Sequence, residues 1–299
     1  MPSEGTVTAD DGIVVLAPDT LFALQNLVEL DGRVAAFPAQ ARGYAPINCY
    51  LLKHGNHFLM LDTGFKYHRE DILRQLTALT DAQSELTLFP LRMNEFMSIS
   101  NTMSIATHFK VAGCLSVLRD AAYHVDLESL DEADILAANQ SLKTILISGN
   151  EQLFVGDDGA RPIQLFQSPI RLIATRWVYD PLTRTLFTSD MFSGLWGADQ
   201  NERWIVSDSE ADTTSVDDVA SFLLNTRYWW LEGAATDNLR RGLASIFEKC
   251  DIETIAPGYG KILSGRAVVT RHYNLLDAAI RRLDRSRTAG RYVGREEVR

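Results

Sequence analysis

The order in which short apolar runs and amphipathic segments follow one another constrains the fold of this chain more than any other feature. In the first third, apolar runs are bounded by turn sequences such as Asp-Gly, His-Gly-Asn and Asp-Thr-Gly, a pattern typical of an antiparallel meander. The strands predicted there cover residues 12–17, 22–30, 33–37, 47–53, 58–62 and 86–91. Residues 67–79 carry apolar side chains at helical spacing, and residues 99–109 and 114–121 are expected to be helical or loop-like.

The second half of the chain repeats this order of strands followed by helices. Strands are predicted at residues 142–148, 152–155, 163–167, 172–179, 185–189 and 252–257. Amphipathic helices are predicted at residues 216–224, 236–249 and 267–283. Two β-then-α halves of similar size predict an α/β (α+β) fold in which helices cover two central sheets. We expect one domain over residues 1–299, with flexible tails at 1–11 and 284–299.

Composition and charge narrow the class of protein. The chain has 299 residues, of which 46% are hydrophobic, enough to bury a sizeable core. Its formal net charge of −10 disfavours a general nucleic-acid role, which needs a basic surface. The three cysteines form no CxxC pair, so a disulfide scaffold or a cysteine zinc site is disfavoured. Since no signal peptide or membrane-spanning run is visible, we expect a cytoplasmic protein without a membrane partner.

Three stretches each place a polar side chain at the end of a predicted strand. The first, N-C-Y-L-L-K-H-G-N-H-F-L-M-L-D-T-G at residues 48–64, reads as a strand hairpin that ends at Asp62. The second, L-F-T-S-D-M-F-S-G at residues 186–194, delivers Asp190 into a turn. The third, I-A-P-G-Y-G-K-I-L at residues 255–263, holds Tyr259 at the tip of a Gly-X-Gly turn. In this order, with the two β-then-α halves, the stretches resemble the metallo-β-lactamase fold.

The resemblance is closest to the diiron domain of flavodiiron proteins and to their stand-alone oxygen-binding relatives. It rests also on Y-D-P-L-T-R-T-L-F-T-S-D-M-F at residues 179–192 and on R-Y-W-W-L-E-G at residues 227–233. It covers roughly residues 12–275 and is diffuse outside the quoted stretches. The resemblance implies a four-layer αββα sandwich and a homodimer.

The metal motif of that family, H-x-E-x-D-H, has the counterpart M-N-E-F-M-S at residues 93–98. Met93 and Ser98 stand where the resemblance implies histidines, and Met97 stands where it implies the aspartate. Glu95 alone matches the motif. Iron and zinc sites of this kind need neutral imidazoles and carboxylates, which this stretch largely lacks.

Three further ligand positions lie later in the chain. The next histidine of the family maps onto Arg171, which eighteen residues separate from Asp190, the spacing that the family uses. Asp190 matches the bridging carboxylate, and Tyr259 takes the place of the histidine in the family's P-G-H-G. Two of the seven ligand positions therefore survive. The resemblance implies a fold with most metal ligands replaced, and we expect neither a metal nor another cofactor.

All six histidines of the chain lie outside these ligand positions. His54 and His57 flank the sequence H-G-N-H, which we interpret as a surface turn because no cysteine or carboxylate is adjacent; a metal site is the alternative. His68 stands at a predicted helix start and is interpreted as a solvated helix residue, with a functional imidazole near the pocket as the alternative.

Charge balance gives the most specific hypothesis about the site. Without metals, the carboxylates of Asp62, Glu95 and Asp190 would repel one another in a partly buried pocket. A guanidinium can hold two carboxylates through forked hydrogen bonds. We therefore hypothesise that Arg171 replaces the metal as counter-charge to Glu95 and Asp190, and that Arg92 contributes a second guanidinium.

Two classes of function remain open at this point, so the sequence leaves undecided whether the protein is an enzyme. The first is a metal-free binding, sensing or scaffold protein that takes a small-molecule or anionic ligand, or a protein partner. The second is an enzyme with metal-independent or atypical-metal chemistry, a hydrolase or an oxidoreductase. The candidate catalytic residues are Glu95, Arg171, Asp190 and Tyr259. The candidate ligand pocket adds Asp62, Arg92 and Ser98 to these four.

Overall fold

The structure is a computed structural model that describes residues 12–93, 95–118, 142–148, 151–156 and 159–286. Of the tails expected at residues 1–11 and 284–299, residues 1–11 and 287–299 lie outside the described residues. The described start of the second tail is held to the fold, because Asp284 accepts the Thr236 backbone N–H at 2.7 Å and Arg285 donates to Ala234 at 2.8 Å. The chain divides into two compact units, which are described one at a time. The first comprises residues 1–26, 47–167 and 173–183, and the second comprises residues 27–46, 168–172 and 184–299. Among the described residues, no helix has the length and apolar character needed to cross a membrane.

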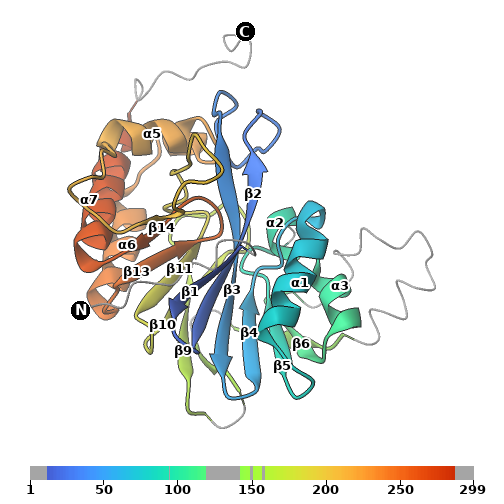
Figure 1. Ribbon diagram of the computed structural model, residues 1–299. Coiled ribbons are helices and arrows are strands. Elements are labelled where there is room, and N and C mark those ends of the chain that lie inside the picture. The colour runs from blue at the N-terminus through green and yellow to red at the C-terminus, as the bar shows by residue number, and fades with distance from the viewer. Residues whose placement is uncertain (1–11, 94, 119–141, 149–150, 157–158, 287–299) are drawn as a thin grey trace. The chain divides into compact units, whose positions relative to one another are not determined.

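The first unit is built on a sheet in which β1 to β7 lie side by side in chain order (Figure 1). Its strands are β1 (Ile13–Ala17), β2 (Leu21–Glu29), β3 (Tyr44–His54), β4 (His57–Leu61), β5 (Glu85–Phe89), β6 (Val111–Ser116) and β7 (Thr144–Leu146). The pairs β1–β2 and β3–β4 are antiparallel, whereas β4, β5, β6 and β7 run parallel. The expected antiparallel meander therefore ends at β4, because helices lie between β4 and β5 and between β5 and β6 and allow these strands to run parallel.

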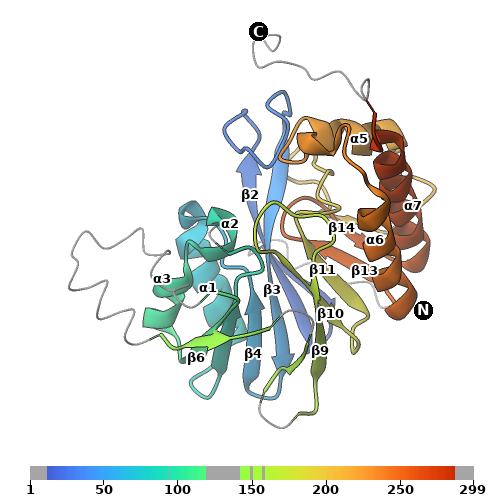
Figure 2. The ribbon, with the colours of Figure 1, turned by 180° about the vertical axis from the view of Figure 1, so that it is seen from behind.

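Helices cover the parallel part of this sheet. They are η1 (Lys66–His68), α1 (Arg69–Leu79), α2 (Phe96–Ile99) and α3 (Thr102–His108). Ile72 and Leu76 of α1 and Ile105 of α3 join the buried cluster of strand side chains that includes Leu51 and Leu88. Figures 1 and 2 both show α1 and α3 beside β4, β5 and β6. The apolar spacing in residues 67–79 thus serves to cover the sheet.

Three antiparallel strands complete the first unit: β8 (Gln152–Phe154), β9 (Pro162–Gln167) and β10 (Arg176–Asp180). A buried ion pair fastens them to the first sheet, because the Arg161 guanidinium lies 2.5 Å from Asp180 and donates to the carbonyl oxygens of Thr20 (2.8 Å) and Lys53 (2.5 Å). Arg161 is 1% exposed, so it crosses the interior between strands of both sheets.

The second unit contains β11 (Thr185–Ser189), β12 (Ile205–Val206), β13 (Thr254–Pro257) and β14 (Ile262–Ser264). The strand order is β12-β14-β13-β11, and β11 runs parallel to β13. Its helices are α5 (Val216–Leu224), η3 (Trp229–Leu231), α6 (Asp237–Lys249) and α7 (Arg266–Leu283). Within this unit α7 packs on β13 and β14 and contacts both α5 and α6 (Figure 2).

Two of the expected elements are wrong. Residues 33–37 form turns rather than a strand, although Ala36 and Phe37 are buried. Residues 111–116 form β6, where the sequence predicted a helix or loop from residue 114 onward. In both places the short apolar run indicates that the residues are buried. It is too short for its periodicity to show which type of element the residues form.

Candidate functional site

The loop after β4 begins with Asp62, a buried aspartate in an unusual backbone conformation. Its φ angle is 60°, a left-handed value that costs a non-glycine residue roughly 1–2 kcal/mol. Its carboxylate accepts hydrogen bonds from the Leu91 backbone N–H (2.7 Å) and from the Ser98 hydroxyl. The Arg92 guanidinium lies 3.3 Å from its second oxygen. These contacts hold the strained residue in place, as is common where a side chain has a specific task.

Arg92 joins the two carboxylates of the first unit. Its side chain is 0% exposed, and its guanidinium nitrogens lie 3.3 Å from Asp62 Oδ2 and 3.7 Å from Glu95 Oε2. Its backbone N–H donates to the Ser98 hydroxyl oxygen at 3.1 Å, and a single β-bridge pairs it with Thr175. A permanent positive charge is therefore fixed between two carboxylates in the interior.

Glu95 has a second task, because it caps the short helix α2. Its carboxylate accepts the Met97 backbone N–H at 3.0 Å. The helix brings Ser98 back to Asp62, and both Met97 and Ser98 are fully buried. Met93 is also buried, and its sulfur accepts the Ser116 hydroxyl at 3.2 Å. Met93, Met97 and Ser98 of the motif counterpart are thus packed into the interior.

Burial dominates the electrostatics of this cluster. It raises the pKa of Asp62, while the Arg92 charge and the hydrogen bonds from Ser98 and Leu91 oppose the rise. Burial also raises the pKa of the Cys49 thiol well above its usual value, and the negative charge of Asp62 adds to that effect. The cluster therefore depends on Arg92 for the stability of any charged form of Asp62.

These residues do not fit a diiron or dizinc centre. Among the described residues, no group of three or more histidine, cysteine, aspartate or glutamate side chains is placed to hold a metal ion. The Asp62 and Glu95 oxygens already accept protein donors, and the guanidinium of Arg92 lies against both. A cationic guanidinium beside the carboxylates also opposes the approach of a metal cation.

The interpretation of His68 is wrong. His68 is 3% exposed and its ring lies 5.3 Å from that of Tyr67, so the expectation of a solvated helix residue is wrong.

The surface turn between His54 and His57 is confirmed, because Gly55 and Asn56 form an exposed turn there, but the premise that no carboxylate is near needs correction. His54 and His57 do pair across the β3–β4 turn, but a carboxylate is close: Glu85 Oε2 lies 3.6 Å from His57 Nδ1. Glu85 starts the neighbouring strand β5, a proximity that sequence distance does not reveal.

Asp190 follows β11 in the second unit and has counter-charges of its own. Ser189 before it has a φ angle of 57°, which turns the chain sharply at the strand end. The Tyr228 hydroxyl donates to Asp190 at 3.2 Å, and the Arg227 guanidinium lies 3.7 Å away. Sequence reasoning missed Arg227, although it stands in the quoted stretch R-Y-W-W-L-E-G.

Tyr259 lies at the tip of the turn between β13 and β14, as the sequence predicted. It is 1% exposed, and its ring meets that of Phe37 edge to face with 5.2 Å between centroids. The flanking Gly258 and Gly260 donate backbone hydrogen bonds to Ser189 (2.7 Å) and Pro46 (2.9 Å). Gly260 has a φ angle of +80°, and a Cβ there would come within 2.5 Å of a backbone oxygen. The turn therefore requires glycine.

Arg171 is exposed, and its guanidinium donates to the carbonyl oxygen of Ser168 at 2.7 Å. Its pairing with Glu95 and Asp190 stays a prediction. Of the seven candidate pocket residues, the first unit brings together Asp62, Arg92, Glu95 and Ser98. The other three, Arg171, Asp190 and Tyr259, belong to the second unit. Convergence of all seven on one pocket stays a prediction.

The fold defines the class of protein: this is a mixed α/β chain with the metallo-β-lactamase-like αββα architecture. The particular solved structures that it resembles are flavodiiron proteins. One is the flavodiiron protein from Giardia intestinalis, with a TM-score of 0.61 and 14% identity over 92% of this chain and 60% of that chain. Another is a mutant flavo di-iron protein from Thermotoga maritima, with a TM-score of 0.62 and 12% identity over 93% and 63%.

A shorter structure matches over most of its own length. It is a fragment of a diflavin flavoprotein from Nostoc, with a TM-score of 0.58 and 13% identity over 88% of this chain and 93% of that chain. By contrast, this chain spans about three fifths of the length of the Giardia and Thermotoga proteins. No protein-family model matches the sequence, and no curated protein matches it. The likeness therefore establishes the fold, and function has to be argued from this chain's own residues.

Proposed function

We propose that this chain is a metal-free binding protein of the metallo-β-lactamase-like fold, in which arginines take over the counter-charge that metal ions supply in a diiron site. One observation carries the proposal: the fully buried guanidinium of Arg92 lies between Asp62 and Glu95, 3.3 and 3.7 Å from their carboxylate oxygens. Arg227 stands in a similar relation to Asp190, at 3.7 Å. Each acidic residue of the candidate site thus lies within 3.7 Å of a guanidinium, which Asp62 and Glu95 share.

The burial of the Asp62 and Ser98 side chains, and the hydrogen bonds that they already make, favour a binding function over catalysis. Asp62 is 2% exposed and Ser98 0%, and each already makes hydrogen bonds within the cluster. A general acid or base has to come within hydrogen-bond reach of a substrate proton, which these two groups do not offer in this arrangement. Arg92 is equally buried, so an anionic ligand would meet the exposed Arg171 instead. The rewired-enzyme alternative would have to rely on Glu95, Arg171, Asp190 or Tyr259, and of these Asp190 and Tyr259 are only 4% and 1% exposed.

Elemental analysis tests the proposal. The full chain is expressed in medium supplemented with iron, zinc and manganese and purified without chelator, beside a diiron flavodiiron protein treated identically. We expect far less than one ion per chain for this protein and close to two irons per chain for the control. Stoichiometric iron, zinc or manganese in this protein, with the control loaded, would overturn the metal-free function.

The homodimer belongs to the same proposal. Exposed aromatic side chains that could contribute to a subunit contact are Tyr67 (87% exposed), Phe96 (60%) and Trp229 (63%). Sedimentation velocity across a hundredfold range of protein concentration would detect the dimer. A single monomer species throughout that range would contradict it.

A further inference from the structure

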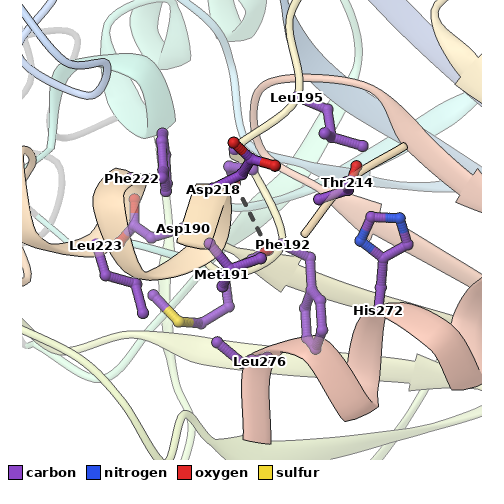
Figure 3. A pocket seen from close by; sticks show the side chains of 13 residues that line it. Asp190, Met191, Phe192, Leu195, Thr214, Asp218, Phe222, Leu223, His272 and Leu276 are labelled. Atoms are coloured by element: carbon purple, nitrogen blue, oxygen red, sulfur yellow. Dashed lines mark hydrogen bonds between the residues drawn. The ribbon is translucent and has the colours of Figure 1, made fainter. Parts of the chain in front are cut away.

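A pocket lies wholly inside the second unit, between the loop after β11 and the helices α5 and α7. Its empty volume is about 480 Å³, the open mouth included. Figure 3 shows Met191 and Phe192 of the loop, Leu223 of α5 and Leu276 of α7 around it. Its walls are therefore mostly apolar, as is usual for small-molecule sites that hold a few well-placed polar groups.

Most polar groups of the wall are already engaged within the protein. Asp190 accepts from Tyr228, and Asp218 accepts from the backbone N–H (2.9 Å) and hydroxyl (2.7 Å) of Ser215. The Thr214 hydroxyl donates to Asp212 at 2.5 Å. Ser193 donates its hydroxyl to backbone carbonyl oxygens of its own loop. These groups shape the pocket without offering a strong hydrogen bond to a guest.

His272 differs from the other polar groups. It is 5% exposed, and its Nε2 lies 2.9 Å from Asp212 Oδ2. Asp212 is itself held by the Arg271 guanidinium at 3.1 Å and by Thr214, so the ring orientation is fixed. Within the described part of the chain, the other ring nitrogen, Nδ1, makes no hydrogen bond. In Figure 3 the imidazole stands on α7, and one ring nitrogen points toward the Phe192 side of the pocket.

The protonation state of this ring follows from its surroundings. Burial lowers the pKa of His272, although the adjacent Asp212 carboxylate opposes this shift. The neutral ring donates Nε2–H to Asp212 and leaves a lone pair on Nδ1, so Nδ1 is a hydrogen-bond acceptor. A guest in this pocket is then required to bring a donor.

We propose that this pocket binds a small, neutral, largely apolar molecule with one hydroxyl or N–H donor, of the phenol or indole class, which donates to Nδ1 of His272. Met191, Phe222 and Leu276 supply apolar surface against which such a molecule would pack. Anions are disfavoured because the acidic Asp190 and Asp218 line the same pocket. The inference rests on the proposed function in that it names a ligand class for a binding protein.

Titration of the full-length protein with matched probes tests the proposal. Phenol and indole carry the donor, toluene lacks it, benzoate is anionic and benzylamine is cationic. We expect phenol to bind at least tenfold more tightly than toluene, since a hydrogen bond to a buried acceptor contributes about 1.5 kcal/mol. Benzoate and benzylamine are expected to bind more weakly than phenol. Equal binding of phenol and toluene, or tighter binding of either charged probe, would overturn the assignment.

Two variants and one spectroscopic measurement separate the pocket from nonspecific binding. His272→Phe keeps the ring but removes Nδ1, and should abolish the preference for phenol over toluene. Phe222→Trp reduces the pocket volume and should weaken both probes, whereas Ser221→Ala on the exposed face of α5 should change neither.

Should His272→Phe fail to fold, the ¹⁵N signal of Nδ1 in the unmodified protein decides the matter. It is expected to move on addition of phenol and to stay in place with toluene. A signal that ignores phenol contradicts the proposal. Metal analysis and probe titration are independent readouts, so failure of the binding test leaves the metal-free proposal standing and the reverse also holds.

Discussion

At the scale of single residues, Arg92 is the side chain on which the candidate site depends most. Its guanidinium is buried and offsets the charges of Asp62 and Glu95. We predict that Arg92→Met lowers the free energy of unfolding by about 3–5 kcal/mol, because removal of one partner leaves buried carboxylates uncompensated. Urea unfolding followed by circular dichroism measures the change.

The matched control is Arg171→Met, which removes an exposed guanidinium and should change stability by no more than about 0.5 kcal/mol. The double variant Arg92→Met, Asp62→Asn should recover part of the loss, because it removes one of the two uncompensated charges. Equal effects of the two single arginine substitutions would argue against a counter-charge role for Arg92.

His272 gives a residue-level prediction on pH. Burial lowers the pKa of His272 below the ordinary value of 6.5. At a pH between the two pKa values, His272 is therefore mostly protonated in the unfolded chain and mostly neutral in the folded chain. The stabilising contribution is therefore complete above about pH 6.5 and declines as the pH falls toward the folded-state pKa. The charged groups around the ring are Asp212 and Arg271, with Asp190 and Asp218 lining the same pocket.

We expect the free energy of unfolding to drop between pH 7.5 and pH 5.5, and to drop less in His272→Gln, which cannot take up this proton. Urea unfolding at both pH values measures the difference. An NMR titration of the His272 ring would place its midpoint below 6.5. A midpoint above 6.5 would mean that Asp212 outweighs burial, and the predicted slope would then reverse.

Residue types were easier to predict from the sequence than residue pairs. The stretches ending at Asp62, Asp190 and Tyr259 were located because turn chemistry at strand ends is local. Arg92 was named because it adjoins the motif at residues 93–98. The pair of His272 with Asp212 joins residues 60 positions apart, and no local pattern marks such a contact. The full burial of Arg92 was equally invisible to sequence reasoning, and the pairing of Arg171 with Glu95 and Asp190 stays a prediction.

At the scale of elements, prediction was reliable where periodicity and end signals agreed. The helix predicted at residues 216–224 is α5, because Ser215 and Asp218 mark its start and apolar residues mark its inner face. Residues 33–37 and 114–121 carried only short apolar runs, and these bury equally well as turn or strand. The parallel pairing of β4 with β5 could not be predicted from the sequence, because it is set by how helices pack on the sheet.

The capping box of α5 yields a prediction at this scale. The Ser215 hydroxyl accepts from the Asp218 backbone N–H at 3.2 Å, while the Asp218 carboxylate accepts from Ser215. Ser215→Ala should lower stability by about 1 kcal/mol, as expected for loss of an N-cap. Because α5 forms one wall of the pocket, the same substitution should also weaken phenol binding. Thermal unfolding and probe titration measure the two effects.

Ser221→Ala is the control for that substitution, since Ser221 is exposed in the middle of the same helix. It should leave stability within about 0.5 kcal/mol of the unmodified protein. Similar losses in the two variants would show that α5 responds to any serine removal, and the cap would then have no special part in holding the pocket wall.

At the scale of the whole molecule, the fold suggests a metal centre, whereas the charges at the candidate site suggest a site without one. The αββα architecture is shared with two proteins named for their diiron content, at 14% and 12% identity. Yet the acidic side chains that survive at the candidate site are matched inside the protein, Asp62 and Glu95 by Arg92 and Asp190 by Arg227. On the proposed function, these guanidiniums replace a bound cation as the counter-charge to the carboxylates.

Carboxylates already paired with guanidiniums should leave the stability of the protein unchanged when metal ions are added. An ion that binds only the folded state at a hundred times its dissociation constant stabilises that state by about 2.7 kcal/mol, which for a chain of this size raises the unfolding midpoint by several degrees. We expect no rise with iron(II), zinc or manganese at millimolar concentration, and no fall with chelator. Differential scanning calorimetry in a buffer that does not bind metals makes the measurement.

A diiron flavodiiron protein run in parallel should lose stability with chelator, which proves that the treatment strips metal. A reproducible rise of several degrees for this chain with any of the three ions would mean that the guanidiniums leave room for a cation, and the counter-charge account would fail.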